Sequence, residues 1–230
     1  MVLRKILLKN QLHFSPVVPF NQQTDRIVKI DLSSTNRLFT SEIYKDINAF
    51  TTFINDYREK TNALYAIGGY GELRNVYSTS TVFDAVTGGK EPRRLHLGTD
   101  IWGAARTSVM APLNGTIHSF ANNNKAGDYG ATIILRHELD NKVFYTLYGH
   151  LSLRSIKDLV EGQTVQQGEA IAEFGISEEN GTWPPHLHFQ VIEDTGNCYG
   201  DYPGVCANSE KEMYLANCPD GDLILALNRF

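Results

Sequence analysis

The sequence lacks the features that define several common protein classes. Its three cysteines all follow residue 197, and an odd, late cluster is not a disulfide framework for a chain of 230 residues. We therefore expect reduced thiols, with one bridge as the alternative. No run approaches the ~20 apolar residues of a membrane helix. Lys9 interrupts the first apolar stretch, so we expect no signal peptide, which favours the cytoplasm unless a leader has been removed.

An excess of positive charge is also absent. The chain has 21 Lys and Arg against 26 Asp and Glu, a net charge of −5. Nucleic-acid binders need clustered basic residues to neutralise phosphates, so this class is excluded. With 42% hydrophobic residues, the chain is too apolar to be disordered. Its length fits one large domain, or one domain with an N-terminal extension.

The pattern of apolar residues predicts an N-terminal α+β region followed by β-structure. Apolar residues spaced by three and four predict one helix over 41–60, with Thr40 or Ser41 as its N-cap. Alternation over 28–32 predicts a strand, and the glycines of 67–71 predict a loop and a subdomain boundary. Later strands are expected at 115–120, 131–137, 143–148, 170–174 and 187–192, with a hairpin turn at 138–141.

The segment Pro185-His186-Leu187-His188-Phe189 contains the most informative histidines. Side chains two apart in a strand project from the same face, so His186 and His188 would point together while Leu187 and Phe189 enter the core. Two adjacent imidazoles repel each other when charged, unless a metal or a hydrogen bond keeps them neutral. The alternative is a pair of solvated surface histidines.

A second group of candidate ligands lies upstream. His96 and Asp100 share a face in either a helix or a strand, and we expect Gly98 between them to leave room for an ion. With His150 they raise the candidates to five: His96, Asp100, His150, His186 and His188. Catalytic zinc commonly takes three protein ligands, which leaves two residues to act as base and oxyanion donor. Spacing alone does not assign these roles. By contrast, His137-Glu138 lacks the second histidine of a helical zinc motif.

Three ordered motifs, HLGTD at 96–100, YGHLS at 148–152 and PHLHF at 185–189, resemble those of the lysostaphin-type zinc endopeptidases, the family that includes LytM-like cell-wall hydrolases. The stretches 109–117 and 161–171 also resemble that family, so the similarity covers about residues 94–195. It implies an antiparallel β-sheet or sandwich of the duplicated hybrid motif type. The domains would be an extension over 1–90, a zinc peptidase core over 91–196 and a cysteine-containing segment over 197–230.

The resemblance also implies a division of roles. His96, Asp100 and His188 would bind one zinc ion, and His150 and His186 would form the catalytic pair. Tyr148, Trp102 and Trp183 are possible groove residues, with core packing as the alternative for the tryptophans. Family members are sometimes latent, with a fourth ligand from the N-terminal segment, for which Asn75 and Asp84 are candidates.

The implied function is zinc-dependent cleavage of a peptide bond, with peptidoglycan peptides as the expected substrate. The longer strings around the motifs resemble a subgroup found in multidomain proteins with an aminotransferase and a kinase-like phosphotransferase, which does not suggest a wall substrate. Three alternatives therefore remain: a non-catalytic metal-binding or regulatory domain, a hydrolase of a non-wall peptide or amide, and a biotinyl-type carrier domain. The carrier ranks last because no lysine lies at a suitable hairpin tip near 165–175.

Overall fold

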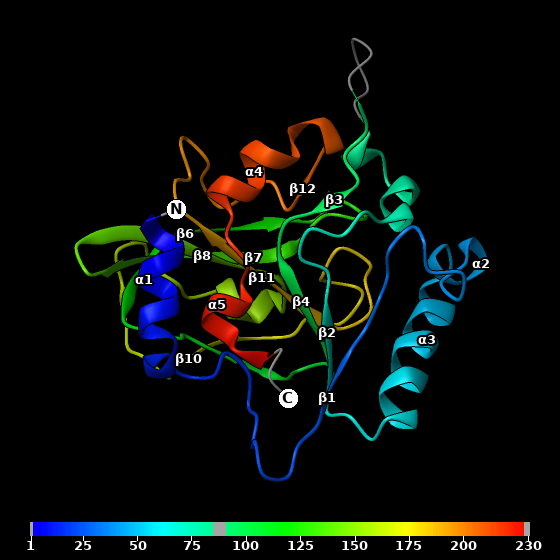
Figure 1. Cartoon of the computed structure of the whole chain (residues 1–230), viewed down its shortest axis with the longest axis horizontal. Coiled ribbons are helices and arrows are strands. Elements are labelled where there is room, and N and C mark those ends of the chain that lie inside the picture. The colour runs from blue at the N-terminus through cyan, green and yellow to red at the C-terminus, as the bar shows by residue number, and fades with distance from the viewer. Residues whose placement is uncertain (1, 85–90, 228–230) are drawn as a thin grey trace.

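One large sheet organises the chain in the computed structural model, which describes residues 2–84 and 91–227 (Figure 1). Its eight strands run in the order β1-β2-β4-β11-β8-β7-β6-β9, and β5 pairs with β10 and β3 with β12 in two smaller sheets. The strands are β1 (Ile27–Lys29), β2 (Tyr65–Gly68), β3 (Leu95–His96), β4 (Thr99–Trp102), β5 (Ser108–Met110), β6 (Gly115–Asn123), β7 (Gly130–Leu139), β8 (Lys142–Leu151), β9 (Thr164–Val165), β10 (Ala170–Glu173), β11 (His186–Ile192) and β12 (Val205–Cys206).

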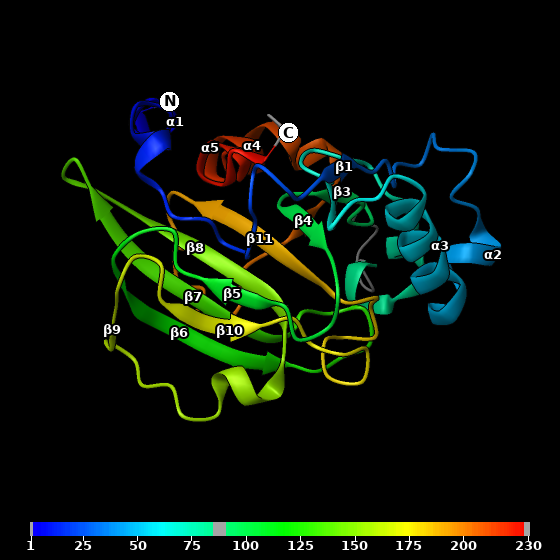
Figure 2. The same cartoon turned by 90° about the horizontal axis from the view of Figure 1, so that it is seen from below.

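Short helices cover the sheet at both ends of the sequence. They are α1 (Val2–Asn10), α2 (Ser41–Tyr44), α3 (Ile47–Lys60), α4 (Lys211–Asn217) and α5 (Asp222–Leu225), with five short 3₁₀ segments between the elements. Seen from below, α1, α4 and α5 lie on one side of the sheet and α3 lies beyond the β1 edge (Figure 2). The predicted fold class, mainly β with an N-terminal α+β extension, is confirmed.

Two expectations about the N-terminal region are wrong in detail. The single helix predicted over 41–60 is two helices, because Asp46 adopts an extended backbone and caps α3 by accepting a hydrogen bond from the Ala49 amide at 2.8 Å. The loop predicted over 67–71 begins later, because Tyr65–Gly68 is a strand that pairs with β4. The β1–β2 pairing is parallel, whereas the other pairings of the large sheet are antiparallel. The predicted boundary at residue 90 lies outside the described residues.

The predicted β-hairpin is present, with a tighter turn than expected. Strands β7 and β8 extend to Leu139 and Lys142, so only Asp140 and Asn141 form the turn. Both have positive φ angles, 49° and 60°, as a two-residue type I′ turn requires, and Asp and Asn tolerate this conformation.

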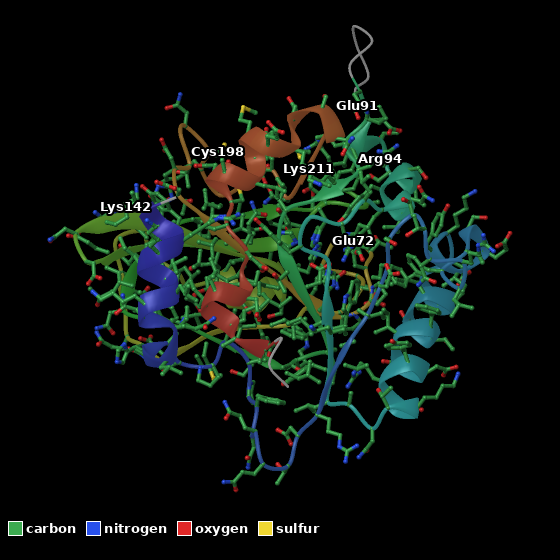
Figure 3. All side chains as sticks on the ribbon, in the orientation of Figure 1. Glu72, Glu91, Arg94, Lys142, Cys198 and Lys211 are labelled. Atoms are coloured by element: carbon green, nitrogen blue, oxygen red, sulfur yellow. The ribbon has the colours of Figure 1, made fainter. Side chains whose placement is uncertain are left out.

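The apolar core lies on one face of the sheet, under α1 and α5. Leu3 and Leu7 of α1 and Ile224 of α5 are buried there with Leu187 and Phe189 of β11. The cysteines are free thiols: Cys206 and Cys218 are buried, and Cys198, which Figure 3 labels, is half-buried. Within 2–84 and 91–227, no helix has the length and apolar character needed to cross a membrane.

A buried histidine outside the site makes stability depend on pH. The Nδ1 of His137 lies 2.9 Å from the Asn114 carbonyl and its Nε2 2.7 Å from the Thr146 hydroxyl, and burial lowers its pKa to about 4. The unfolded chain binds this proton below a pKa of about 6.5, whereas the folded chain binds it only near 4. His137 therefore contributes stability that is lost as the pH falls from 6.5 to 4.

Urea denaturation of the metal-free protein checks this prediction. Between pH 6 and pH 5, the free energy of unfolding of the His137→Gln variant should fall by about 1 kcal/mol less than that of the wild type. The comparison isolates His137 from the other buried histidines, which are present in both proteins. Equal slopes in the two proteins would contradict the prediction.

Candidate metal centre and adjoining imidazoles

Strand β11 presents its two histidines on the face opposite the core. His186 and His188 are each 2% exposed, and Leu187 and Phe189 point into the apolar core as the period of two predicts. The antiparallel pairing with β4 places His188 directly opposite Asp100. The pairing of β11 with β4 thus makes neighbours of Asp100 and His188, which are 88 positions apart in the sequence.

His96 and Asp100 flank a tight turn between β3 and β4. Gly98 in this turn serves a purpose different from the one expected, because a Cβ there would lie 2.5 Å from the ring of His188. The glycine therefore makes room for the His188 imidazole. The turn and the neighbouring strand together place three side chains around one point.

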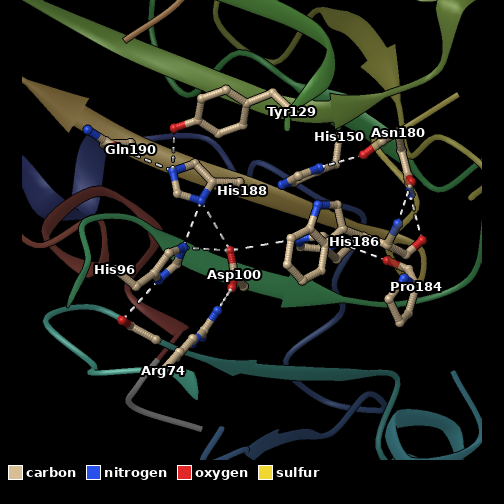
Figure 4. Close-up of polar contacts among 12 residues, drawn as sticks. Arg74, His96, Asp100, Tyr129, His150, Asn180, Pro184, His186, His188 and Gln190 are labelled. Atoms are coloured by element: carbon tan, nitrogen blue, oxygen red, sulfur yellow. Dashed lines mark hydrogen bonds and ion pairs between the residues drawn. The ribbon is translucent and has the colours of Figure 1, made fainter. Parts of the chain in front are cut away.

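These three side chains form a compact group of nitrogen and oxygen atoms (Figure 4). His96 Nε2 lies 2.8 Å from His188 Nδ1, and Asp100 Oδ1 lies 3.3 Å from each of them. All three residues are at most 2% exposed. Asp100 Oδ1 is buried without a hydrogen-bond partner.

Hydrogen bonds on the far side of each imidazole define which nitrogen carries the proton. His96 Nδ1 lies 3.0 Å from the Gly69 carbonyl, which only accepts, so this nitrogen is the donor. His188 Nε2 lies 2.9 Å from Gln190 Oε1. The orientation of the Gln190 amide follows from its Nε2, which donates to the Pro203 carbonyl at 3.2 Å.

With the protons on His96 Nδ1 and His188 Nε2, the other nitrogen of each ring faces a carboxylate oxygen that has no hydrogen-bond partner. Burial lowers the pKa of His96 to about 4, which keeps its ring neutral near pH 7. Burial opposes ionisation of Asp100, but His96 and Arg74 outweigh it and hold its pKa well below the usual range. Three close acceptors with no proton between them repel one another unless a cation lies among them. The donor set fits zinc, which commonly takes three N or O ligands in open sites.

His150 and His186 lie beside this group and form a stacked pair. Their ring centroids are 4.2 Å apart, and His186 Nε2 is 4.0 Å from Asp100 Oδ1. Each Nδ1 lies 2.8 Å from a backbone carbonyl, of Asn180 and Pro184 respectively, so each Nε2 keeps its lone pair. Burial lowers the pKa of His186 to about 4 and, with help from His186, that of His150 well below its ordinary value. Both rings are neutral proton acceptors near pH 7.

The backbone of His150 explains why Tyr148 does not line the site as expected. In a regular strand, Tyr148 and His150 would share a face. His150 instead has φ of 61°, and the β7–β8 register shifts nearby, so its ring turns to the site while Tyr148 stays in the core, fully buried against Phe189. Gly149 lies between them, where a Cβ would overlap the ring of Tyr129.

The metal group and the imidazole pair line one cavity of about 440 Å³. Trp102 and Trp183 also line this cavity, and both side chains are buried. Trp102 stacks on His186 at 3.9 Å between centroids, and Trp183 meets the His150 ring edge-on at 6.0 Å. None of the five polar site residues is more than 6% exposed, so they lie deep in the cavity wall.

The N-terminal region reaches the site through a different residue from those expected. Asn75 is exposed, and Asp84 pairs with Arg94 at 2.5 Å, so neither is a fourth ligand of the described group. The side chain of Arg74 reaches the site instead, with Nη1 2.6 Å from Asp100 Oδ2.

Two residues that contact the site were missed in the sequence analysis. Gln190 could have been predicted, because it continues the period of two from His186 and His188. No sequence signal links Arg74 to Asp100.

Across residues 2–84 and 91–227, the fold and the site define a mainly β protein with a buried His–Asp–His group that could hold a metal ion and two neutral imidazoles beside it. Residues 94–199 match the model of peptidase family M23. The expected resemblance to the lysostaphin-type peptidases is thereby confirmed. No curated protein matches the chain.

Solved structures with similarity to the chain include three peptidases. The catalytic domain of the antimicrobial peptidase lysostaphin from Staphylococcus simulans is 25% identical over 66% of this chain and 93% of that one, with a TM-score of 0.40. LytU is 26% identical over 61% and 83%, with a TM-score of 0.36. A zinc-containing peptidase from Vibrio cholerae is 29% identical over 43% of this chain, with a TM-score of 0.34. The chain covers only 27% of the Vibrio cholerae protein.

Proposed function

We propose that the chain is a zinc-dependent peptidase in which His96, Asp100 and His188 hold the metal and His150 and His186 move protons. The observation that carries the proposal is the convergence of two imidazole nitrogens and one carboxylate oxygen within 4.8 Å of one another, in a segment that matches peptidase family M23. When bound, zinc supplies Lewis acidity, which lowers the pKa of water and polarises a carbonyl group.

The imidazole pair supplies the proton transfers that peptide hydrolysis needs. As the oxygen of water bonds to the carbonyl carbon, the Nε2 of His150 or His186 accepts the proton that water releases. The imidazolium so formed is a donor at the same atom and stabilises the negative charge of the tetrahedral oxygen. When the carbon–nitrogen bond breaks, this proton passes to the leaving amine. The carbonyls of Asn180 and Pro184 hold both rings in the tautomer required.

Peptidoglycan peptides are the first substrates to test, because the sequence resembles cell-wall hydrolases. The apolar part of the cavity wall favours a second candidate, a hydrolase of short non-wall peptides or other amides. The cavity is bounded by apolar side chains from outside the matched segment, among them Leu32, Phe50 and Val76. A pocket of about 440 Å³ lies in the range of those that bury a small ligand, and a cross-linked polymer is harder to fit.

One experiment separates these functions. The zinc-loaded protein is incubated with purified sacculi, and separately with short peptides containing glycine, D-alanine or a bulky apolar residue, with and without a chelator. Mass analysis of the products should show cleavage that the chelator abolishes and added zinc restores. Cleavage of sacculi supports a wall substrate, and cleavage of short peptides alone supports the second candidate. If zinc binds and nothing is cleaved, the chain is a metal-binding domain without activity.

A further inference from the structure

We propose that Arg74 is a positioning residue of the metal site, which orients Asp100 so that one carboxylate oxygen faces the metal and the other does not. This inference rests on the proposed zinc site. It concerns a side chain that lies before the segment matched to the peptidase family, residues 94–199.

The guanidinium of Arg74 contacts two carboxylates inside the protein, of which Figure 4 shows that of Asp100. Its Nη1 lies 2.6 Å from Asp100 Oδ2, and its Nε lies 2.5 Å from Glu72 Oε2. The hydroxyl of Tyr77 is 3.4 Å from Nη1. Arg74 is 3% exposed, so these contacts are shielded from water and salt.

The guanidinium is itself held in place from several directions. Glu72 accepts a second hydrogen bond, from the Leu32 amide to Oε1 at 3.1 Å, and the Arg74 amide donates to the Arg94 carbonyl at 2.9 Å. Gly69 has φ of +103°, and a Cβ on it would overlap Arg74 Nη2. The backbone of Gly69 also accepts the His96 Nδ1 proton at 3.0 Å. One turn therefore supports both Arg74 and a metal ligand.

The two oxygens of Asp100 have different environments as a result. Oδ2 is taken by Arg74, whereas Oδ1 has no partner and lies 3.3 Å from both His96 Nε2 and His188 Nδ1. Fixing Oδ2 prevents the carboxylate from rotating and from binding a metal through both oxygens. An outer contact of this kind orients a ligand, and removing it typically weakens metal binding 10–100-fold.

The alternative is a purely structural role, in which Arg74 does not position Asp100 and Asp100 serves only to neutralise the buried charge of Arg74. Glu72 already supplies a carboxylate to Arg74 at 2.5 Å. Asp100 therefore is not needed for charge balance, and its Oδ1 points away from Arg74 to the two imidazoles. The geometry favours positioning over neutralisation.

A double-mutant cycle on the full chain tests the proposal. The zinc dissociation constant is measured by competition with a chromophoric chelator for the wild type, Arg74→Met, Asp100→Asn and the double variant. We expect Arg74→Met alone to bind zinc 10–100-fold more weakly. In the Asp100→Asn background the same change should alter affinity by no more than about twofold, because there is no longer a carboxylate to orient. The cobalt-substituted Arg74→Met protein should also show a changed visible spectrum, since Asp100 is then free to bind through both oxygens.

The control is Arg94→Met, which removes a nearby arginine that pairs with Asp84 and not with the site (Figure 3). Its zinc affinity should equal that of the wild type. If Arg74→Met does not fold, Arg74→Lys keeps the charge but cannot bridge both carboxylates, and should show an intermediate loss. The positioning role is overturned if the Arg74 variant that folds binds zinc as tightly as the wild type. It is also overturned if replacing Arg74 weakens zinc binding equally in the wild-type and the Asp100→Asn backgrounds. A wild-type chain that binds no zinc overturns the proposed function itself.

Discussion

Replacing Asp100 with alanine is expected to leave the protein without zinc after dialysis, whereas the wild type retains one ion per chain. The binding free energy of zinc at sites with four ligands is about 10–16 kcal/mol, or roughly 3 kcal/mol per ligand. Losing one ligand should therefore weaken zinc binding at least ~100-fold. Elemental analysis of the dialysed proteins measures the stoichiometry. His96→Ala should behave in the same way, because it removes another member of the same group.

The alanine variant carries a second defect that needs a separate control. Asp100 also pairs with Arg74 at 2.6 Å, and breaking a buried ion pair from one side typically costs about 3–5 kcal/mol. Asp100→Asn keeps an oxygen that accepts from the guanidinium, so it should fold more stably than Asp100→Ala while still binding zinc weakly. If either variant retains a full zinc ion per chain, Asp100 is not a ligand.

The second large effect is expected at His150. His150→Asn should bind zinc as the wild type does, because His150 is not among the three grouped ligands, but kcat should fall about 10²–10⁴-fold. The loss follows from removing a neutral imidazole whose Nε2 accepts a proton. Zinc content and peptide cleavage are measured on the same preparation, using whichever substrate the proposed-function experiment identifies.

A matched histidine outside the site provides the control. His118 is half-buried, with Nδ1 2.8 Å from the Ser119 hydroxyl, and does not line the cavity. His118→Gln should leave kcat within about twofold of the wild type, since surface changes away from the site rarely exceed ~0.5 kcal/mol. A His150→Asn enzyme with nearly full activity would remove His150 from the proposed mechanism.

The features of this site that the sequence predicts are those that depend on residues close together in the sequence. The shared face of His186 and His188 follows from the period of a strand, and the β-regions follow from alternating apolar residues and turn signals. These features are local, so a short stretch of sequence contains the information. The position of Gln190 belongs to the same class, because it extends the same face by one step.

The features that sequence reasoning missed depend on backbone geometry or on distant contacts. The break before α3 results from competition between an apolar periodicity and a capping aspartate, Asp46. The side chain of His150 points toward the site because its backbone is left-handed, and no residue pattern predicts this conformation. The contact between Arg74 and Asp100 joins side chains 26 positions apart from separate strands and turns. Such contacts form only when the sheet order brings the segments together.

The left-handed backbone of His150 has an evolutionary consequence. A residue with a Cβ in this conformation is disfavoured by roughly 1–2 kcal/mol, whereas asparagine and glycine tolerate it. Selection for folding alone would favour asparagine or glycine here, so under the proposed function the proton transfer at His150 is what would retain the histidine. A lineage that no longer needs catalysis should lose its histidine here early and gain thermal stability as it does so. Asparagine or glycine at this position would then mark descendants that keep the fold after the activity has gone.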